Sequence, residues 1–329
     1  MPLALDLACW DYDRTRALAD GRVRVEGVDL NYIPMEMPES FHRMFRNAEF
    51  DASEMSFAWY VGSLFRERRN MVAIPVFPSR MFRHSGIYVN TKSGIVTPDD
   101  LIGKRVGVPE YQQTAGVWIR GILADYYGVP VDSVRYFQGG LNQPGRLESA
   151  LRRPEAIQLD TIPSDETLSA MLARGELDAV YTAHAPDGFA DGAPYVRRLF
   201  PDYRREEQMY YERTGIFPIM HTVVVRAELL TSHPWLAQSL TKAFEAAKKI
   251  AVDDLFEPAT AKTALPWLTA EAEATERLFG SRDFWPYGAE ANQHVIDAFL
   301  RYMHEQGLVP RRLTVEELFP QSTLRVART

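Results

Sequence analysis

Cysteine, long apolar runs and clusters of basic residues are scarce or missing in this 329-residue chain. The single cysteine, Cys9, excludes a disulfide framework and fits a reducing compartment. No stretch approaches the ~20 consecutive apolar residues that a membrane-spanning helix needs. The net charge is −7 and no Lys/Arg-rich run is present, whereas nucleic-acid binding requires a basic face. We therefore expect neither a membrane nor a nucleic-acid partner.

The sequence motifs typical of nucleotide, metal and serine-hydrolase sites are also missing. There is no phosphate-binding glycine loop, no dinucleotide fingerprint and no Gly-x-Ser-x-Gly elbow, and Gly139-Gly140 is typical of a turn. His, Cys, Asp and Glu residues do not show zinc-ligand spacing. We therefore expect no cofactor and no metal.

The first residues do not resemble an export signal. Cys9 follows Leu7 and Ala8, as in a lipoprotein cleavage site, but Asp6 interrupts the apolar stretch and no basic residue precedes it. The segment 3–8 is better interpreted as a first strand. We therefore expect a cytoplasmic protein.

What the chain does contain is an alternation of strand and helix patterns. Its length favours two domains, and 46% hydrophobic with 25% charged residues is ordinary for a globular protein. Strand patterns occur at 27–33, 50–56, 72–77, 104–109, 195–200 and 221–226. A helix after the fourth of these has apolar residues at 115, 118, 119, 122 and 126, which form one face. This alternation predicts an α/β fold with mostly parallel sheets flanked by helices.

The segment 84–123 predicts two lobes joined by a hinge. It has the pattern of a strand, a short crossing, a second strand and a turn that opens a helix, as in a two-lobed binding protein that closes on its ligand. We expect lobe one to comprise residues 1–94 and 212–329, lobe two to comprise residues 95–211, and a ligand cleft to lie between them.

A short internal echo supports this arrangement. Residues 49–52 and 176–179 share the pattern Glu-apolar-Asp-Ala, and each leads into a strand that ends in small polar residues. Open α/β sheets bind ligands at strand ends, so Glu54, Ser56, Thr182 and His184 are expected at the cleft. Chance repetition is the alternative explanation.

The turn at 110–114 is a candidate anion site. Backbone N–H groups at a helix start are unpaired and the helix dipole is positive there, and Gln112, Gln113 and Thr114 add side-chain donors. The alternative is an ordinary capped helix start. Trp10 and Tyr111 are candidates for stacking on an aromatic ligand, although most aromatic residues belong to the core.

Arginines supply further candidate carboxylate contacts. Arg14 follows the first strand, and Arg80 and Arg83 precede His84 and the next strand. Arginine holds carboxylates in two-pronged contacts. The alternative for Arg14 is a surface salt bridge with Asp11 or Asp13.

A catalytic cleft also requires a residue that donates a proton. His184 and His221 are candidates because imidazole titrates near neutral pH, and Glu54 or Glu110 becomes one if desolvation raises its pKa. The other histidines (His42, His233, His294 and His304) lie in helical or cap contexts and are expected to be structural. The expected catalytic residues are His221, His184, Glu54 and Glu110, and the expected substrate-binding residues are Trp10, Arg14, Ser56, Arg80, Arg83, His84, Tyr111, Gln112, Gln113, Thr114, Thr182 and Thr222.

Several segments together resemble the 4,5-dihydroxyphthalate decarboxylase family, and they span nearly the whole chain. They are 12–15, 20–21, 26–27, 77–80, 83–85, 87–90, 103–112, 117–121, 218–223 and 233–235. The resemblance implies a type II periplasmic-binding-protein fold without transport, and an enzyme that converts 4,5-dihydroxyphthalate to protocatechuate. It implies a small aromatic carboxylate as partner, and leaves open whether the chain forms a homo-oligomer.

The chemistry expected from this resemblance needs no redox cofactor or metal. A hydroxyl para to the departing carboxylate pushes electron density onto the carbon that bears it, an acid protonates that carbon, and loss of CO2 restores aromaticity. Two alternatives remain: a solute-binding protein of a transporter or sensor, and another enzyme of this fold that resembles the chorismate-derived dehydratases of menaquinone synthesis.

Overall fold

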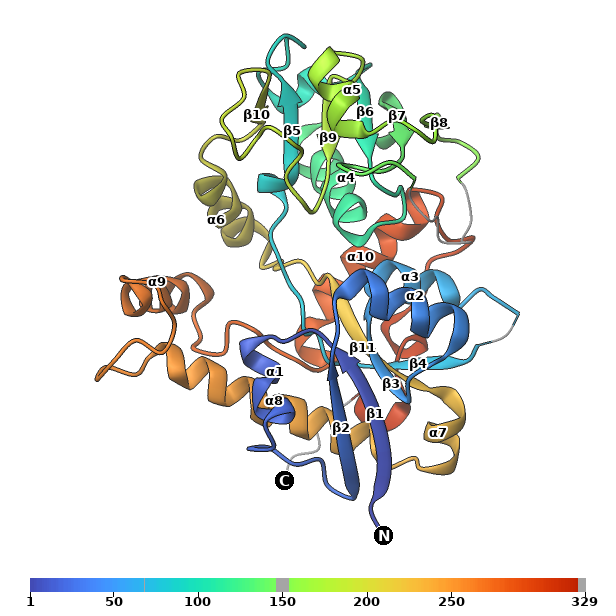
Figure 1. Ribbon diagram of the computed structural model, residues 1–329, viewed down its shortest axis with the longest axis vertical. Coiled ribbons are helices and arrows are strands. Elements are labelled where there is room, and N and C mark those ends of the chain that lie inside the picture. The colour runs from blue at the N-terminus through green and yellow to red at the C-terminus, as the bar shows by residue number, and fades with distance from the viewer. Residues whose placement is uncertain (68, 146–153, 325–329) are drawn as a thin grey trace.

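The computed structural model describes residues 1–67, 69–145 and 154–324 and has two lobes, each built on one sheet (Figure 1). In the first sheet, of order β2-β1-β3-β11-β4, β1 is parallel to β2 and β3, and β11 is antiparallel to β3 and β4. Its strands are β1 (Leu3–Cys9), β2 (Val28–Pro34), β3 (Ala52–Ser56), β4 (Met71–Ile74) and β11 (His221–Arg226).

The second sheet has the order β10-β5-β9-β6-β7-β8. The strands β9, β6, β7 and β8 are parallel, whereas β5 is antiparallel to β9 and β10. Its strands are β5 (Ile87–Asn90), β6 (Arg105–Val108), β7 (Arg135–Gln138), β8 (Leu159–Thr161), β9 (Ala179–Tyr181) and β10 (Val196–Arg198).

Both sheets are therefore mixed, because each contains one strand, β5 or β11, that runs antiparallel to its neighbours. A helical crossover within a lobe makes the next strand parallel, but β5 and β11 follow a direct crossing and run the opposite way. Since β5 pairs in the second sheet, the first crossing occupies residues 75–86, upstream of the boundary expected at residue 94. The return crossing spans residues 215–220, and the bridge between Arg80 and Ile219 joins the two crossings.

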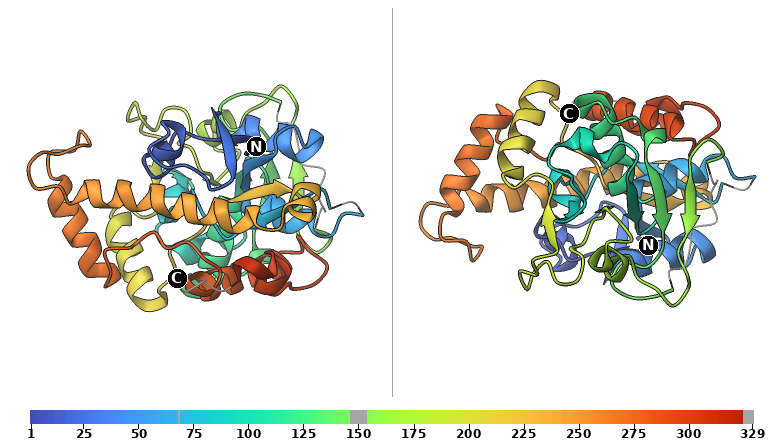
Figure 2. Two further views of the ribbon diagram at one scale, coloured as in Figure 1. Left: turned by 90° about the horizontal axis from the view of Figure 1, so that it is seen from below. Right: turned by 90° about the horizontal axis from the view of Figure 1, so that it is seen from above.

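Helices cover both sheets and tie the lobes together. In Figure 2, α8 runs across the first lobe and α9 projects at one end beside α6, where Arg204 of α6 pairs with Glu271 of α9. The helices are α1 (Asp13–Ala19), α2 (Met37–Asn47), α3 (Phe57–Ser63), α4 (Thr114–Tyr127), α5 (Leu168–Arg174), α6 (Tyr203–Thr214), α7 (Ala227–Ser232), α8 (Leu236–Leu255), α9 (Leu268–Phe279) and α10 (Gln293–Glu305). Within the described ranges, no helix is both long and apolar enough to cross a membrane.

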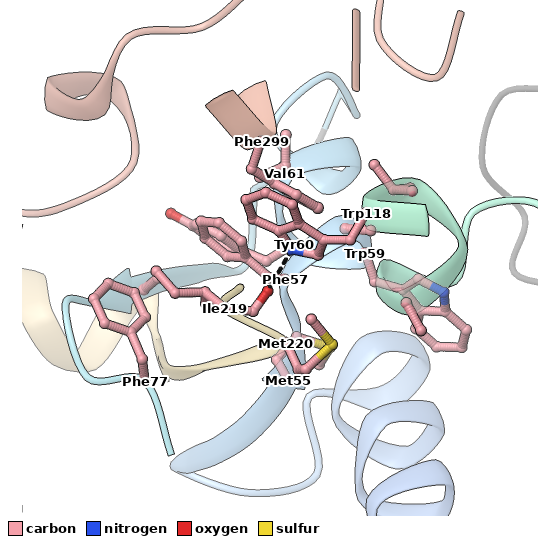
Figure 3. Packing of buried hydrophobic residues seen from close by; sticks show 14 of the residues in the cluster. Met55, Phe57, Trp59, Tyr60, Val61, Phe77, Trp118, Ile219, Met220 and Phe299 are labelled. Atoms are coloured by element: carbon pink, nitrogen blue, oxygen red, sulfur yellow. Dashed lines mark hydrogen bonds between the residues drawn. The ribbon is translucent and has the colours of Figure 1, made fainter. Parts of the chain in front are cut away.

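One continuous core runs from the first lobe through the crossings into α4 (Figure 3). The rings of Phe57 and Phe299 stack with centroids 4.9 Å apart, and Trp118 lies 5.3 Å from Phe299. Trp118 also donates its indole N–H to the carbonyl of Ile219 in the return crossing, at 2.8 Å. The start of α4 is thereby held against the hinge, next to the cavity described below.

Candidate active site

A cavity of about 210 Å³ lies between the lobes. The first lobe contributes α2 and the start of α3, the second lobe contributes the start of α4 and the turn after β9, and both crossings contribute side chains. Its lining residues are Met37, Pro38, Phe41, His42, Ser56, Trp59, Ser79, Met81, Arg83, Glu110, Gln113, Thr114, Ala115, Ala183, His184, Met220 and His221. A volume below the ~300–1,000 Å³ of drug-sized sites suits a ligand with one ring.

Hydrogen bonds cross the cavity from one lobe to the other. Thr114 Oγ1, at the start of α4, lies 2.9 Å from Ser56 Oγ and accepts from the N–H of Ala58 at 3.1 Å. The indole N–H of Trp59 donates to Glu110 Oε1 at 2.9 Å. Since α3 belongs to the first lobe and α4 to the second, these bonds join the two lobes across the cavity.

His221 and Glu54 form a pair at one wall of the cavity. His221 Nδ1 lies 2.6 Å from Glu54 Oε1. Only His221 lines the cavity; Glu54 is fully buried behind it. Burial disfavours the charged carboxylate, but hydrogen bonds from His221, Tyr12 and the Trp10 N–H outweigh this and hold the pKa of Glu54 below its usual value. This direction argues against Glu54 as the proton donor, because that role required a raised pKa.

Arg83 is a buried cation that lines the same cavity. Its Nε contacts the sulfur of Met220 at 3.0 Å, and among the described residues it has no ion-pair partner. Burial lowers the pKa of Arg83 to about 10, opposed by the charge of Glu207. The guanidinium therefore stays charged at neutral pH with its Nη groups available for an anion. Met220 directly precedes His221 in the chain, and Arg83 and His221 both line the cavity.

The other two expected arginines hold protein atoms instead of facing the cavity. Arg14 donates Nε to the carbonyl of Pro78 at 2.5 Å, pairs with Asp13, and stacks on the rings of Tyr12 and Trp285. Arg80 is buried and donates to Asn292 Oδ1 and to the carbonyls of Phe217 and Pro286. Both serve the packing around the crossings.

Two other histidines expected at the site, His184 and His84, lie in different surroundings. His184 lines the cavity, and its backbone N–H donates to Thr182 Oγ1 at 3.1 Å. His84 points away from the cavity into the rings of Tyr127, Phe200 and Tyr210. Neither of its ring nitrogens has a hydrogen-bond partner among the described residues, and burial lowers its pKa to about 4. His84 is therefore a neutral core residue and not a substrate contact.

Some side chains of the turn before α4 line the cavity, and others are buried in the core. Glu110, Gln113 and Thr114 line the cavity, as does Ser56 opposite them. Tyr111 instead packs its ring under the guanidinium of Arg120, 3.8 Å away, and Gln112 is buried outside the lining.

Three further expected contacts are also structural. The N–H of Trp10 holds Glu54 Oε2 at 3.1 Å, whereas its ring does not reach the cavity. Thr182 and Thr222 are buried, and Thr222 Oγ1 donates to the carbonyl of Ile74 at 3.0 Å. Thr222 is turned away from the cavity because it follows His221 on β11, and adjacent residues of a strand face opposite sides.

Several lining residues were not expected from the sequence. The largest group belongs to α2: Met37, Pro38, Phe41 and His42, the last of which was expected to be structural. The apolar face of α2 was the available signal, but such a face predicts burial and not which lobe or ligand covers it. Among the described residues, no group of three or more His, Cys, Asp or Glu could hold a metal ion.

Comparison with known proteins agrees with this two-lobed arrangement. No family model matches the sequence. Solved structures with a similar fold include the alkanesulfonate-binding protein of Xanthomonas axonopodis pv. citri, with a TM-score of 0.52 and 14% identity over 97% of this chain and 98% of that one. A periplasmic sulfonate-binding protein of a putative transporter from Methylobacillus flagellatus KT has a TM-score of 0.55 and 12% identity over 97% and 92%. These likenesses establish a periplasmic-binding-protein-like fold.

Sequence relatives narrow the assignment. A 4,5-dihydroxyphthalate decarboxylase of Comamonas testosteroni is 43% identical over 323 residues, which cover 98% of both chains. The enzyme of the same name from Pseudomonas putida is 43% identical over 201 residues, covering 61% of this chain and 78% of that protein. At this identity and coverage, the chain belongs to the 4,5-dihydroxyphthalate decarboxylase family.

Proposed function

We propose that this protein removes one carboxylate from a hydroxylated aromatic ortho-dicarboxylate, with 4,5-dihydroxyphthalate as the first candidate. The observation that carries the proposal is that a charged arginine, Arg83, and a carboxylate-paired histidine, His221, both line the cavity between the lobes. The family membership supplies the reaction class. We also propose a cytoplasmic location, which the lone, unpaired Cys9 suits.

In the proposed reaction, Arg83 binds the carboxylate that is retained, and the donors at the start of α4 surround the other end of the ligand. The imidazolium form of His221 donates its Nε2 proton to the ring carbon that bears the departing carboxylate, which leaves a neutral ring with its proton on Nδ1. The ring hydroxyl para to this carbon stabilises the positive charge that develops. The carbon–carbon bond then breaks, its electron pair returns to the ring, and CO2 leaves. Water later reprotonates His221. Closure of the lobes excludes water, which strengthens each charge interaction.

The direct test is incubation with 4,5-dihydroxyphthalate, with CO2 and protocatechuate measured over time. In deuterated water we expect one deuterium at the ring position that lost its carboxylate. Phthalate, which lacks the hydroxyls, is the matched control: it should bind but not react. Tight binding of 4,5-dihydroxyphthalate without CO2 release would reject the proposal for this substrate and favour a solute-binding function.

The proton donor is tested by comparing His221→Gln with His184→Gln. We expect His221→Gln to lower kcat by roughly 10²-fold or more, the usual contribution of a general acid, with little change in ligand binding. If only His184→Gln lowers kcat, then His184 is the donor and the role given to His221 is wrong.

A further inference from the structure

Glu54 lies one layer behind the cavity and accepts an unusual number of hydrogen bonds. Oε1 accepts from Tyr12 Oη at 2.7 Å and lies 2.6 Å from His221 Nδ1. Oε2 accepts from the N–H of Trp10 at 3.1 Å and contacts Cys9 Sγ at 3.6 Å. A carboxylate held by this many donors has one orientation, and the side chain is fully buried.

The negative charge of the Glu54 carboxylate also acts on His221. Among the described residues, the one ion pair of Glu54 is with His221. An isolated buried carboxylate is strongly disfavoured unless it is paired and hydrogen-bonded. Glu54 therefore supplies a counter-charge to His221 whenever the imidazole is protonated, and its other three donors keep it ionised.

Sheet pairing and ring packing fix the imidazole itself. In the β3–β11 register, His221 lies opposite Ser56, so Glu54 is its diagonal neighbour on the same face. The ring of Phe41 meets the imidazole edge-on, with centroids 4.9 Å apart at 75°. With Nδ1 bonded to Glu54, Nε2 is the nitrogen that remains for the cavity.

We infer that Glu54 and Tyr12 are positioning residues that hold the His221 ring with its Nδ1 proton on Glu54 and its Nε2 toward the substrate. Tyr12 acts through Glu54, because it donates to the same oxygen that accepts from His221. Neither residue lines the cavity. This inference rests on the proposed function for its kinetic part only.

Other titratable groups near His221 could also change its behaviour when Glu54 or Tyr12 is replaced. They are Cys9 and Tyr12 beside Glu54, Arg83 on the crossing, His42 on α2, Glu110 before α4, and His184 after β9. Apart from Tyr12→Phe itself, the variants compared in the test therefore leave all of these groups in place.

The first measurement needs no substrate. Nitrogen NMR of histidine-labelled protein should show the neutral His221 ring in one tautomer, with the proton on Nδ1. Glu54→Gln should produce a mixture of tautomers, because an amide both donates and accepts, and Tyr12→Phe should shift the Nδ1–H signal. A neutral ring with its proton on Nε2 in the unmodified protein would overturn the inference.

The second measurement is kinetic. We expect Glu54→Gln to lower kcat by roughly 10²-fold or more and Tyr12→Phe by roughly tenfold, both with a nearly constant KM. Tyr32→Phe is the matched control, since Tyr32 Oη bonds the carbonyl of Trp10 and Thr15 Oγ1 but not Glu54; it should lose stability and keep kcat. Unchanged kcat in Glu54→Gln overturns the positioning role of Glu54, whereas an inactive unmodified protein overturns the proposed function alone.

Discussion

Three arginines near the crossings differ in what their guanidinium groups already hold. Arg14 and Arg80 are occupied by protein oxygens. Arg83 is about as buried as Arg80, but within the described part of the chain its hydrogen bond goes to the sulfur of Met220 and it forms no ion pair, although the charge of Glu207 acts on it. A buried charge without an ion-pair partner destabilises a fold, so the presence of Arg83 in a cavity points to an external anion.

Replacing Arg83 with Met should weaken ligand binding and stabilise the empty protein. Loss of a buried charge pair typically costs about 2–5 kcal/mol of binding, so we expect the affinity for phthalate to fall by roughly 10²-fold or more. The Tm without ligand should rise, because an uncompensated charge is removed. Titration calorimetry and thermal melting measure the two effects. Arg80→Met is the control and should lower Tm, because it frees three buried oxygens; equal effects in both variants would contradict the distinction.

His84 and Glu207 affect stability in opposite directions as the pH changes. Burial lowers the pKa of His84 from 6.5 to about 4, so the unfolded chain binds more protons between these values and stability falls as the pH drops through this window. Burial raises the pKa of Glu207 from 4.5 to about 7, opposed by hydrogen bonds from Ser85. The folded state then binds more protons, and stability falls as the pH rises from 4.5 to 7.

Single variants should separate these opposing contributions. In His84→Phe, which suits the surrounding rings, the acid-side loss should shrink by roughly 3 kcal/mol between pH 6.5 and 4. In Glu207→Gln, the loss of stability between pH 4.5 and 7 should disappear. Urea unfolding at a series of pH values measures both. If the free energy of unfolding changes with pH in a variant as it does in the unmodified protein, the assignment for that residue is wrong.

At the level of elements, the helix starts of α3 and α4 meet across the cavity. Thr114 is the link, since its hydroxyl serves both Ser56 and the N–H of Ala58. Its backbone belongs to the second lobe and its partners to the first. The same residue thus contributes to the cavity lining and to contact between the lobes.

Thr114→Val should destabilise this contact while preserving side-chain shape. The Ala58 N–H loses its acceptor, and an unsatisfied buried donor costs about 1–3 kcal/mol. We expect a lower unfolding midpoint and a higher KM. Thr114→Ser keeps the hydroxyl and should behave like the unmodified protein. Denaturant titration and steady-state kinetics provide the measurements, and equal behaviour of the two variants would show that the hydroxyl has no such role.

Local patterns were enough to predict the α/β class, the return strand at His221 and the helix start at Thr114. They could not place β5, because strand pairing between distant segments decides which sheet it joins. They also could not rank Arg83 above Arg14 and Arg80, since burial and the nearby carbonyls of Phe217 and Pro286 arise only in the folded chain. The contribution of α2 to the cavity was missed for the same reason.

At the scale of the whole molecule, direct hydrogen bonds join the two lobes across the cavity. Trp59 and Glu110 form one such contact, and Thr114 forms the others. The substrate must enter and the products must leave, so we propose that the lobes open about the paired crossings. Hinge closure of this type is common in two-lobed binding folds.

Trp59→Phe should shift the protein toward an open form. The variant keeps an aromatic ring but loses the N–H that reaches Glu110, so closure loses one hydrogen bond. Small-angle X-ray scattering should show a larger radius of gyration without ligand, which returns toward the unmodified value when phthalate is added. Trp285→Phe, which removes an indole bond to the Phe77 carbonyl away from the cavity lining, is the control. An identical radius for the Trp59 variant and the unmodified protein would contradict this role.

Because the chain has a single cysteine, the reactivity of its thiol can be used to measure opening of the first sheet. Cys9 is fully buried beside Glu54, and burial together with the Glu54 charge raises its thiol pKa well above the usual value. A disulfide reagent can therefore react only when β1 separates from its neighbours. The labelling rate should report how often this sheet opens, and it should fall when phthalate binds at the far side of the His221–Glu54 pair.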